Sequence, residues 1–188
     1  ARPKVTIESL KHLVRYAGNT GILNQINTSI VKNVLRSGGV RVGAVMTHRT
    51  KIVSVEKRSR AEDVIQSMID SGYSRFPVYD EDPERVVGVV LIKDVARVVV
   101  TGEGSTLLSR LMVEPVYVPE NRTVHQVLTK LRRERLNMGI VLDEYGGLQG
   151  LVTMEDVVEE FVGEIYDENE VEETRPIVSV RDNEYLIR

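Results

Sequence analysis

The 188-residue sequence contains no cysteine and no tryptophan, and only two phenylalanines. The absence of cysteine excludes disulfide bonds, thiol catalysis and cysteine-ligated zinc or iron–sulfur sites. No apolar run approaches the roughly 18 residues that a membrane-spanning helix needs. The whole sequence is 41% hydrophobic and 28% charged, which is the composition of one ordinary globular domain or two small ones.

Motifs of common enzyme classes are also missing. There is no phosphate-binding loop and no nucleophile elbow, and the glycines at 102–104 are too few for a dinucleotide-binding fingerprint. The three histidines, His12, His48 and His125, lack the spacing of metal ligands. We therefore predict a protein that is not an enzyme. A metal-dependent hydrolase is the least favoured class, because no nucleophile, base and oxyanion donor can be nominated together.

The formal net charge of -3 hides an uneven distribution of charge along the chain. Residues 1–60 carry twelve Lys and Arg against only Glu8 and Glu56, whereas residues 143–173 carry twelve Asp and Glu and no basic residue. One interpretation is solvated helix faces and tails. Another places the basic part near an anionic membrane surface, where each Lys or Arg contributes about 1 kcal/mol. Nucleic acid is not an expected partner, because the basic residues are not interleaved with aromatic ones.

The chain repeats itself. Residues 55–80, VEKRSRAEDVIQSMIDSGYSRFPVYD, overlay residues 118–143, VPENRTVHQVLTKLRRERLNMGIVLD, without a gap. Apolar positions then coincide: Val64 meets Val127 and Met68 meets Leu131. With one residue of slack in the next turn, GVVLIKDV from Gly88 meets GLVTMEDV from Gly150. Two copies of one structural unit are present.

Each copy predicts the element order β-α-β-β-α. In the first, a β-branched run at 51–55 precedes a helix-period segment at 61–68 and two apolar strands at 75–79 and 86–91. A closing helix follows in each copy. A unit of roughly 60 residues is too small to bury both faces of its sheet. We therefore predict an α/β (α+β) fold in which the copies pack with approximate two-fold symmetry and share a ligand cleft.

These copies resemble a tandem pair of cystathionine-β-synthase (CBS) domains. Each opens with a Met-containing element, AVMT at 44–47 or RLMV at 110–113, and closes with Gly-x-x-x-x-x-Asp. The stretches SGYSRFPVYD and VLDEYGGLQGLVTMEDVVEEFVGEIYDE are similar to the CorC/HlyC group of magnesium and cobalt efflux proteins, also called hemolysin-like and related to the cyclin M transporters. The sequence departs from the family pattern at His48 and Lys51, which puts the charge at that edge of the site in question.

The resemblance implies a domain plan. Residues 1–39 would be a helical connector from a preceding membrane domain, 40–103 the first CBS repeat, 104–168 the second, and 169–188 an acidic linker with the truncated start of a C-terminal domain. The chain would be a homodimeric module on the cytoplasmic side of the cell membrane, with its own transmembrane domain as a partner. It would bind an adenine nucleotide, ATP or AMP with or without Mg²⁺, and control the attached efflux protein. A ligand-free dimerisation scaffold remains the alternative.

The resemblance also implies a nucleotide pocket that both copies complete, formed by Thr47, Tyr73, Ser74, Arg75, Phe76, Pro77, Thr153 and Asp156. In it, Asp156 would accept hydrogen bonds from the ribose hydroxyls, a chemistry that suits two carboxylate oxygens. Arg75 and Ser74 would hold phosphate, while Tyr73 and its neighbours would offer apolar surface to the base. For Phe76 and Pro77, simple core and turn positions are an equal alternative.

Residues alone support a second interpretation of Thr153 and Asp156. A Thr followed three positions later by an acidic residue, ahead of an apolar-periodic run, predicts a helix capping box. The two interpretations are compatible. The first copy has Leu91 in place of the Thr, so its site at Asp94 is expected to be weaker or empty.

The acidic helix invites a metal hypothesis. Asp156, Glu160 and Glu164 fall at successive i, i+4 positions, and Mg²⁺ prefers oxygen ligands. A solvated helix face is favoured, because Mg²⁺ sites usually rely on substrate phosphates. We predict no metal site in the protein itself and expect Mg²⁺ to arrive bound to ATP.

Overall fold

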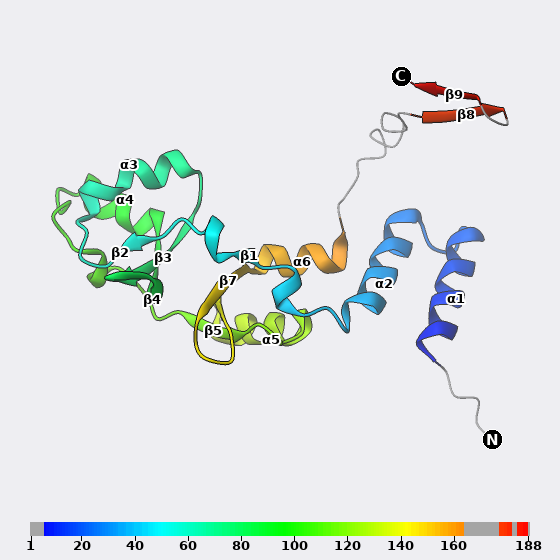
Figure 1. Ribbon diagram of the computed structural model, residues 1–188, viewed down its shortest axis with the longest axis horizontal. Helices are drawn as coiled ribbons and strands as arrows, with labels where there is room; N and C mark the ends of the chain where they lie inside the picture. Colours follow the sequence, from blue (N-terminus) through cyan, green and yellow to red (C-terminus); the bar gives the residue numbers. More distant parts are fainter. Residues whose placement is uncertain (1–5, 164–176, 182–183, 188) are drawn as a thin grey trace.

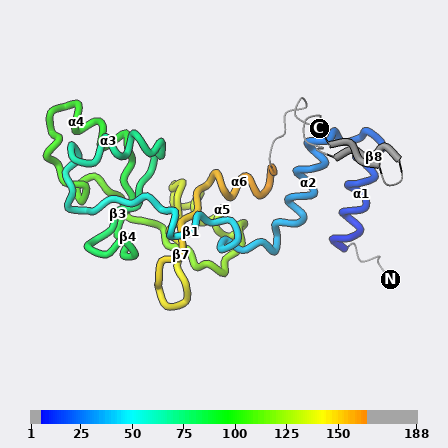
Figure 2. Tube along the Cα trace, turned by 45° about the horizontal axis from the view of Figure 1, so that its top comes forward, coloured from blue at the N-terminus to red at the C-terminus, as the bar shows by residue number. Residues whose placement is uncertain are grey.

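The computed structural model describes residues 6–163, 177–181 and 184–187. Two helices, α1 (Ile7–Asn19) and α2 (Gln25–Ser37), come first, and each begins at a capping side chain, Thr6 or Asn24. The two repeats and this helical pair lie in a row, with repeat 2 in the middle (Figures 1 and 2). In the part of the chain that is described, no helix combines the length and apolar character needed to cross a bilayer.

Repeat 1 has the predicted element order. It comprises β2 (Val55–Glu56), α3 (Ala61–Ser71), β3 (Arg75–Asp80), β4 (Asp82–Leu91) and α4 (Ile92–Val100), with strand order β2-β3-β4. The predicted strand at 51–55 is wrong for most of its length: Lys51 ends a 3₁₀ turn, η2 (Arg49–Lys51), residues 52–54 are not in a strand, and only Val55 belongs to β2. The His48 ring accepts a hydrogen bond from the Thr50 amide, and such local bonds compete with strand pairing.

Repeat 2 follows the same order with a longer first strand. It comprises β5 (Val116–Pro119), α5 (Val124–Glu134), β6 (Met138–Leu142), β7 (Leu148–Thr153) and α6 (Met154–Val162). Its sheet has the order β1-β7-β6-β5, so it includes a strand, β1 (Thr47–His48), from the opening segment of repeat 1. The mixed α+β architecture is therefore as predicted for both copies.

The segments that open the two repeats are exchanged between them. The 3₁₀ turn η1 (Val42–Ala44) places Val42 in the core of repeat 2, and its amide donates to the Arg122 carbonyl at 2.8 Å. The turn η3 (Leu108–Arg110) places Leu108 in the core of repeat 1, with its amide donating to the Ser59 carbonyl at 3.0 Å. Both side chains are fully buried. Each core is thus completed by chain that precedes the opposite repeat.

A third apolar cluster joins the repeats. Its buried members come from β4 of repeat 1 and from β6 and β7 of repeat 2: Val86, Val89, Met138, Ile140, Leu148 and Leu151. This cluster is the predicted packing of sheet against sheet.

The helical pair is attached to repeat 2. Helix α2 packs against α6, and the Ser37 hydroxyl lies 3.2 Å from the His125 Nε2 atom. The His125 ring in turn stacks against Phe161 with ring centroids 4.7 Å apart. At the other end of the chain, β8 (Ile177–Arg181) and β9 (Glu184–Ile187) form an antiparallel pair. The expected acidic linker and Glu164 lie outside the described residues.

Candidate functional site

Helix α6 begins with the predicted capping box. The Thr153 hydroxyl accepts from the Asp156 amide at 3.2 Å, and the Asp156 Oδ2 atom accepts from the Thr153 amide at 2.7 Å. The capping interpretation is therefore confirmed. The box occupies one carboxylate oxygen of the half-buried Asp156, so the second oxygen is available to a ligand hydroxyl.

Thr47 reaches this end of repeat 2 through the exchange of segments. In the antiparallel pairing of β1 with β7, Thr47 lies opposite Leu151 and His48 lies opposite Gly150. Leu151 is two residues before Thr153 on the same strand. Thr47 and Thr153 therefore belong to one sheet although 106 positions separate them in the sequence.

Arg75 stands at the beginning of β3 and contacts the first turn of α6. Its Nη1 atom lies 3.6 Å from the Glu155 Oε1 atom, and its side chain is one-quarter exposed, against 65% for Glu155. This ion pair crosses from repeat 1 to repeat 2. The ion pair places Arg75, the residue predicted to bind phosphate, beside the capping box. Sequence reasoning missed Glu155 as its partner, because nothing local to either residue signals the pairing.

The neighbours of Arg75 divide into exposed and buried side chains. Tyr73 is 56% exposed, and its ring packs edge-on against Phe76 with centroids 6.4 Å apart. Phe76 is 0% exposed within the repeat 1 core, and Pro77 is buried as well. These two residues therefore occupy core positions and expose no surface to a base. Ser74 is exposed, and its carbonyl accepts from the Ile92 amide at 3.1 Å.

The corresponding end of repeat 1 differs chemically. Leu91 caps α4 without any side-chain hydrogen bond, and the Asp94 carboxylate pairs with Arg97 at 3.2 Å. Beside it, a cleft of about 300 Å³ lies between the repeats; this second cleft is lined by other residues than the predicted Thr153 and Asp156. Its walls include Arg75, Leu91, Lys93, Arg135, Asn137 and Met138.

Two basic residues of this second cleft were not predicted as site residues. Alignment of the copies places Lys93 opposite Glu155 and Arg135 opposite Gly72. Comparing the charge of matched positions, in addition to their hydrophobicity, would have identified both.

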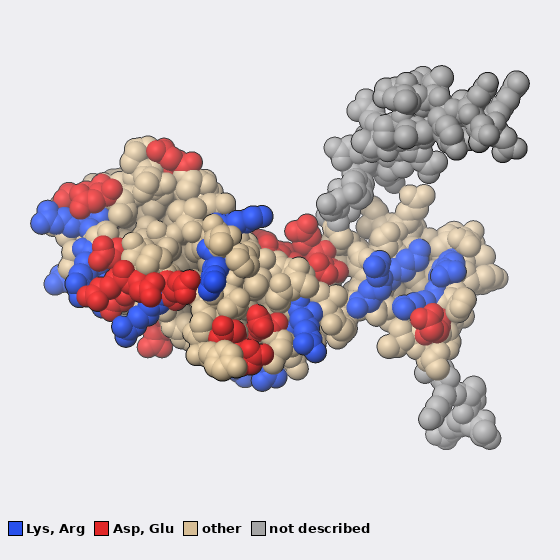
Figure 3. Space-filling view, in the orientation of Figure 1, with Lys and Arg blue, Asp and Glu red and all other residues tan. Residues whose placement is uncertain are grey.

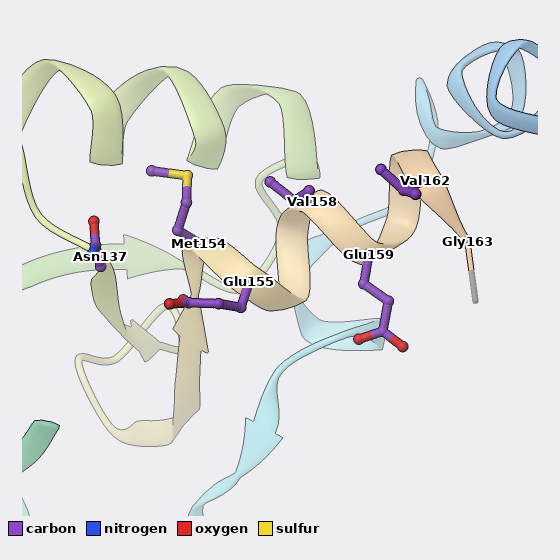
Figure 4. Close-up of a pocket in the computed structure, with 7 residues that line it drawn as sticks. All are labelled: Asn137, Met154, Glu155, Val158, Glu159, Val162 and Gly163. Atoms are coloured by element: carbon purple, nitrogen blue, oxygen red, sulfur yellow. The ribbon is translucent and has the colours of Figure 1, made fainter. Parts of the chain in front are cut away.

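Helix α6 also borders an apolar hollow of about 460 Å³ on its outer side. Val158 and Val162 line it from one side of the helix, while the Glu159 carboxylate points to the other (Figure 4). Val158 is 41% exposed. Among the described residues, no group of three or more His, Asp or Glu side chains could hold a metal ion.

Within the described part of the chain, two carboxyl groups with shifted pKa values lie in turns away from α6. A hydrogen bond from the Gly147 amide, opposed by burial and joined by bonds from Tyr145 and Gln149, lowers the pKa of Asp143. The Lys57 side chain bonds to Asp80 and lowers its pKa. Both groups are therefore charged at neutral pH and hold their hairpins.

A family model described as the CBS domain matches residues 42–101 and 108–163. The magnesium and cobalt efflux protein CorC of Escherichia coli is 30% identical over 88% of this chain and 57% of its own length. A UPF0053 protein of Mycobacterium tuberculosis is 32% identical over 95% of this chain and 42% of its own length. The chain thus spans about half the length of these curated relatives.

Solved structures resemble the larger part of this chain. The CBS domain of a bacterial CNNM/CorC family Mg²⁺ transporter is 34% identical, with a TM-score of 0.80 over 87% of this chain and 100% of that one. The same kind of domain in complex with ATP is 36% identical, with a TM-score of 0.69 over 73% of this chain and 97% of that one. A CBS-domain pair from Klebsiella pneumoniae with bound AMP is 28% identical, with a TM-score of 0.59 over 66% and 99%.

Proposed function

We propose, because this chain belongs to the CBS domain family as a tandem pair of the CorC type, that it is a nucleotide-sensing regulatory module. It binds an adenine nucleotide, ATP with Mg²⁺ or AMP, between its two repeats. Binding controls an attached membrane protein that exports magnesium or cobalt. The module itself carries out no chemical reaction.

The observation that carries this proposal is the 3.6 Å ion pair between Arg75 and Glu155. It brings a basic side chain of repeat 1 to the capping box of repeat 2, which contains Asp156, the residue proposed to bind the ribose. Similar domains in solved complexes bind ATP or AMP. In this arrangement Asp156 takes the ribose diol, Tyr73 flanks the base, and Arg75 with the positive end of α6 takes the phosphates.

The ion pair also suggests how binding would be sensed. Phosphate must compete with Glu155 for Arg75, so the nucleotide-bound and free states differ in a contact that links the repeats. A ligand shifts a conformational equilibrium only by its differential affinity for the two states. Displacement of Glu155 from Arg75 supplies such a difference in affinity. Mg²⁺ bound to the phosphates would offset the negative charge of the Glu155 carboxylate.

The module would lie on the cytoplasmic side of the membrane, linked to a transmembrane domain by α1 and α2. Lys and Arg side chains gather over these helices, whereas acidic side chains gather over α6 (Figure 3). Exposed members of the basic group include Arg15, Lys32 and Arg36. Basic side chains on these helices would be attracted to the anionic headgroups of a nearby membrane surface.

A ligand-free dimerisation scaffold is the second candidate, and the apolar hollow along α6 favours it. A second copy of the chain seated at Val158 and Val162 would cover this surface. Calorimetry with AMP, ADP and ATP, each with and without Mg²⁺, separates the candidates. Absence of heat at millimolar nucleotide, together with a stable dimer, would leave the scaffold as the function.

Asp156→Asn separates a ligand role from a capping role. Asparagine keeps a side-chain oxygen for the Thr153 amide but loses the charge, so most of the capping energy should remain. Hydrogen bonds to a charged group contribute about 1.5–3 kcal/mol, so we expect nucleotide affinity to fall roughly 10- to 100-fold in calorimetry. Equal loss of thermal stability and affinity would show that the residue is mainly structural.

Changes at the ion pair should act on the phosphates alone. We expect Arg75→Ala to weaken ATP binding about tenfold or more and to leave adenosine binding nearly unchanged. Glu155→Gln frees the guanidinium and removes a negative charge, so ATP should bind this variant more tightly, with less dependence on Mg²⁺. Glu159→Gln, one turn along α6, is the matched control for lost charge. An equal effect of Arg75→Ala on ATP and adenosine would rule out a phosphate role.

A further inference from the structure

The second cleft between the repeats has an unusual set of charges. Three basic side chains, Arg75, Lys93 and Arg135, line its hollow of about 300 Å³, against one acidic side chain, Glu114. The remaining lining is largely apolar and includes Leu91 and Met138 from the ends of β4 and β6. Clefts that concentrate charge of one sign on apolar walls attract small ions of the opposite sign.

Arg135 carries a conformational cost in this position. It ends α5 in the left-handed region, with φ 55° and ψ 35°, where repeat 1 has Gly72 with φ 73°. Glycine adopts this conformation freely, whereas a side chain with a Cβ atom is strained there. Strained positions of this kind are typical of functional sites. The fold alone would favour glycine, as in the other repeat, so the guanidinium needs another explanation.

The cleft is poorly suited to a nucleoside. Leu91 stands where Thr153 caps α6, and the Asp94 carboxylate is engaged by Arg97 at 3.2 Å. Lys93, at the start of α4, occupies the position that matches Glu155 at the start of α6. The charge at the helix start is therefore positive in repeat 1 and negative at the candidate nucleotide site. The second cleft is lined by three cations, and Asp94 is not among the residues that line it.

We propose that this second cleft is a binding site for a small polyanion of the pyrophosphate class, held by Arg135 and Lys93 with Arg75 at its edge. An arginine fork accepts two phosphate oxygens at once, and the lysine adds a point charge. Lys93 belongs to repeat 1 and Arg135 to repeat 2, so each of two linked phosphate groups would bind a cation of a different repeat. This inference does not depend on whether adenine nucleotide binds at Thr153 and Asp156.

Variants at Arg135 test the proposal with inorganic pyrophosphate as the probe. Arg135→Gln removes the charge and keeps the strain, whereas Arg135→Gly removes both. We expect each to weaken pyrophosphate binding about tenfold or more in calorimetry. Only Arg135→Gly should raise Tm, by about 2–4 °C. Opposite changes of stability and affinity in one variant distinguish a ligand role from a structural one.

Two controls fix the location of the anion. Arg132→Gln removes an exposed charge from the same helix and should leave pyrophosphate affinity unchanged. Arg135→Gln should leave ATP affinity unchanged, because Arg135 lines the second cleft and is not one of the proposed nucleotide-binding residues. Binding of pyrophosphate to Arg135→Gln as tightly as to the original protein would overturn the proposal. So would an equal loss of ATP affinity in Arg135→Gln, which would place Arg135 in the nucleotide site, or absence of heat at millimolar pyrophosphate.

Discussion

Phe76→Ala is expected to lower the free energy of unfolding by about 3–5 kcal/mol, the usual cost of truncating a buried aromatic ring. The Phe76 ring is fully buried in the repeat 1 core, where Met68, Val78 and Val90 belong to the same cluster and are also fully buried. Rigid strands β3 and β4 form two sides of this site, so the cavity cannot collapse easily. Urea denaturation followed by circular dichroism measures the change.

Phe76→Leu is the matched variant that separates stability from binding. Leucine retains most of the buried apolar volume, so the loss should be about 1 kcal/mol, and the protein should fold. Nucleotide affinity should then equal that of the original protein, whereas Tyr73→Ala should reduce it by removing the exposed ring. If folded Phe76→Leu lost nucleotide affinity tenfold while Tyr73→Ala retained it, the base would have to contact Phe76.

The parts of the fold that follow from local sequence could be predicted. Gap-free overlay of residues 55–80 and 118–143 predicted the element order of both copies, because helical and strand periodicities are set by neighbouring residues. The capping box at Thr153 was predicted for the same reason, since its two partners are three positions apart. The family resemblance added the idea that one pocket uses both repeats.

Contacts between distant residues could not be predicted from the sequence. The exchange that puts Val42 in repeat 2 and Leu108 in repeat 1 leaves no periodicity, because each is a single apolar residue in a short turn. The pairing of Arg75 with Glu155 depends on how two sheets pack. Phe76 could equally face core or ligand, since its flanking residues do not alternate clearly between apolar and polar.

The exchange of segments predicts a large effect of a single methyl group at Gly150. A Cβ atom there would overlap the backbone carbonyl oxygen of Thr47 and lie 2.9 Å from the Met46 sulfur. Because Thr47 belongs to the paired strand β1, the obstacle is backbone and cannot rotate away. We expect Gly150→Ala to cost about 2–3 kcal/mol and to push β1 off the edge of β7.

The matched position in the other repeat provides the control. Gly88 occupies it in repeat 1, where the three atoms nearest to an added Cβ all belong to the Met112 side chain, with the sulfur at 2.6 Å, Cγ at 2.9 Å and Cβ at 3.0 Å. A flexible methionine can adopt another rotamer, so Gly88→Ala should cost about 1 kcal/mol or less. Denaturation of the two variants under one condition gives the comparison.

Binding distinguishes the two glycines further. Displacement of β1 moves Thr47 away from Thr153, so Gly150→Ala should weaken ATP binding even where the variant remains fully folded. Gly88→Ala should leave ATP binding unchanged, because its sheet edge pairs with Val113 at the second cleft. Equal stability losses and equal ATP affinities in the two variants would mean that the exchanged segment contributes nothing to the nucleotide site. The expected inequality would instead show that the segment preceding repeat 1 is part of the pocket of repeat 2.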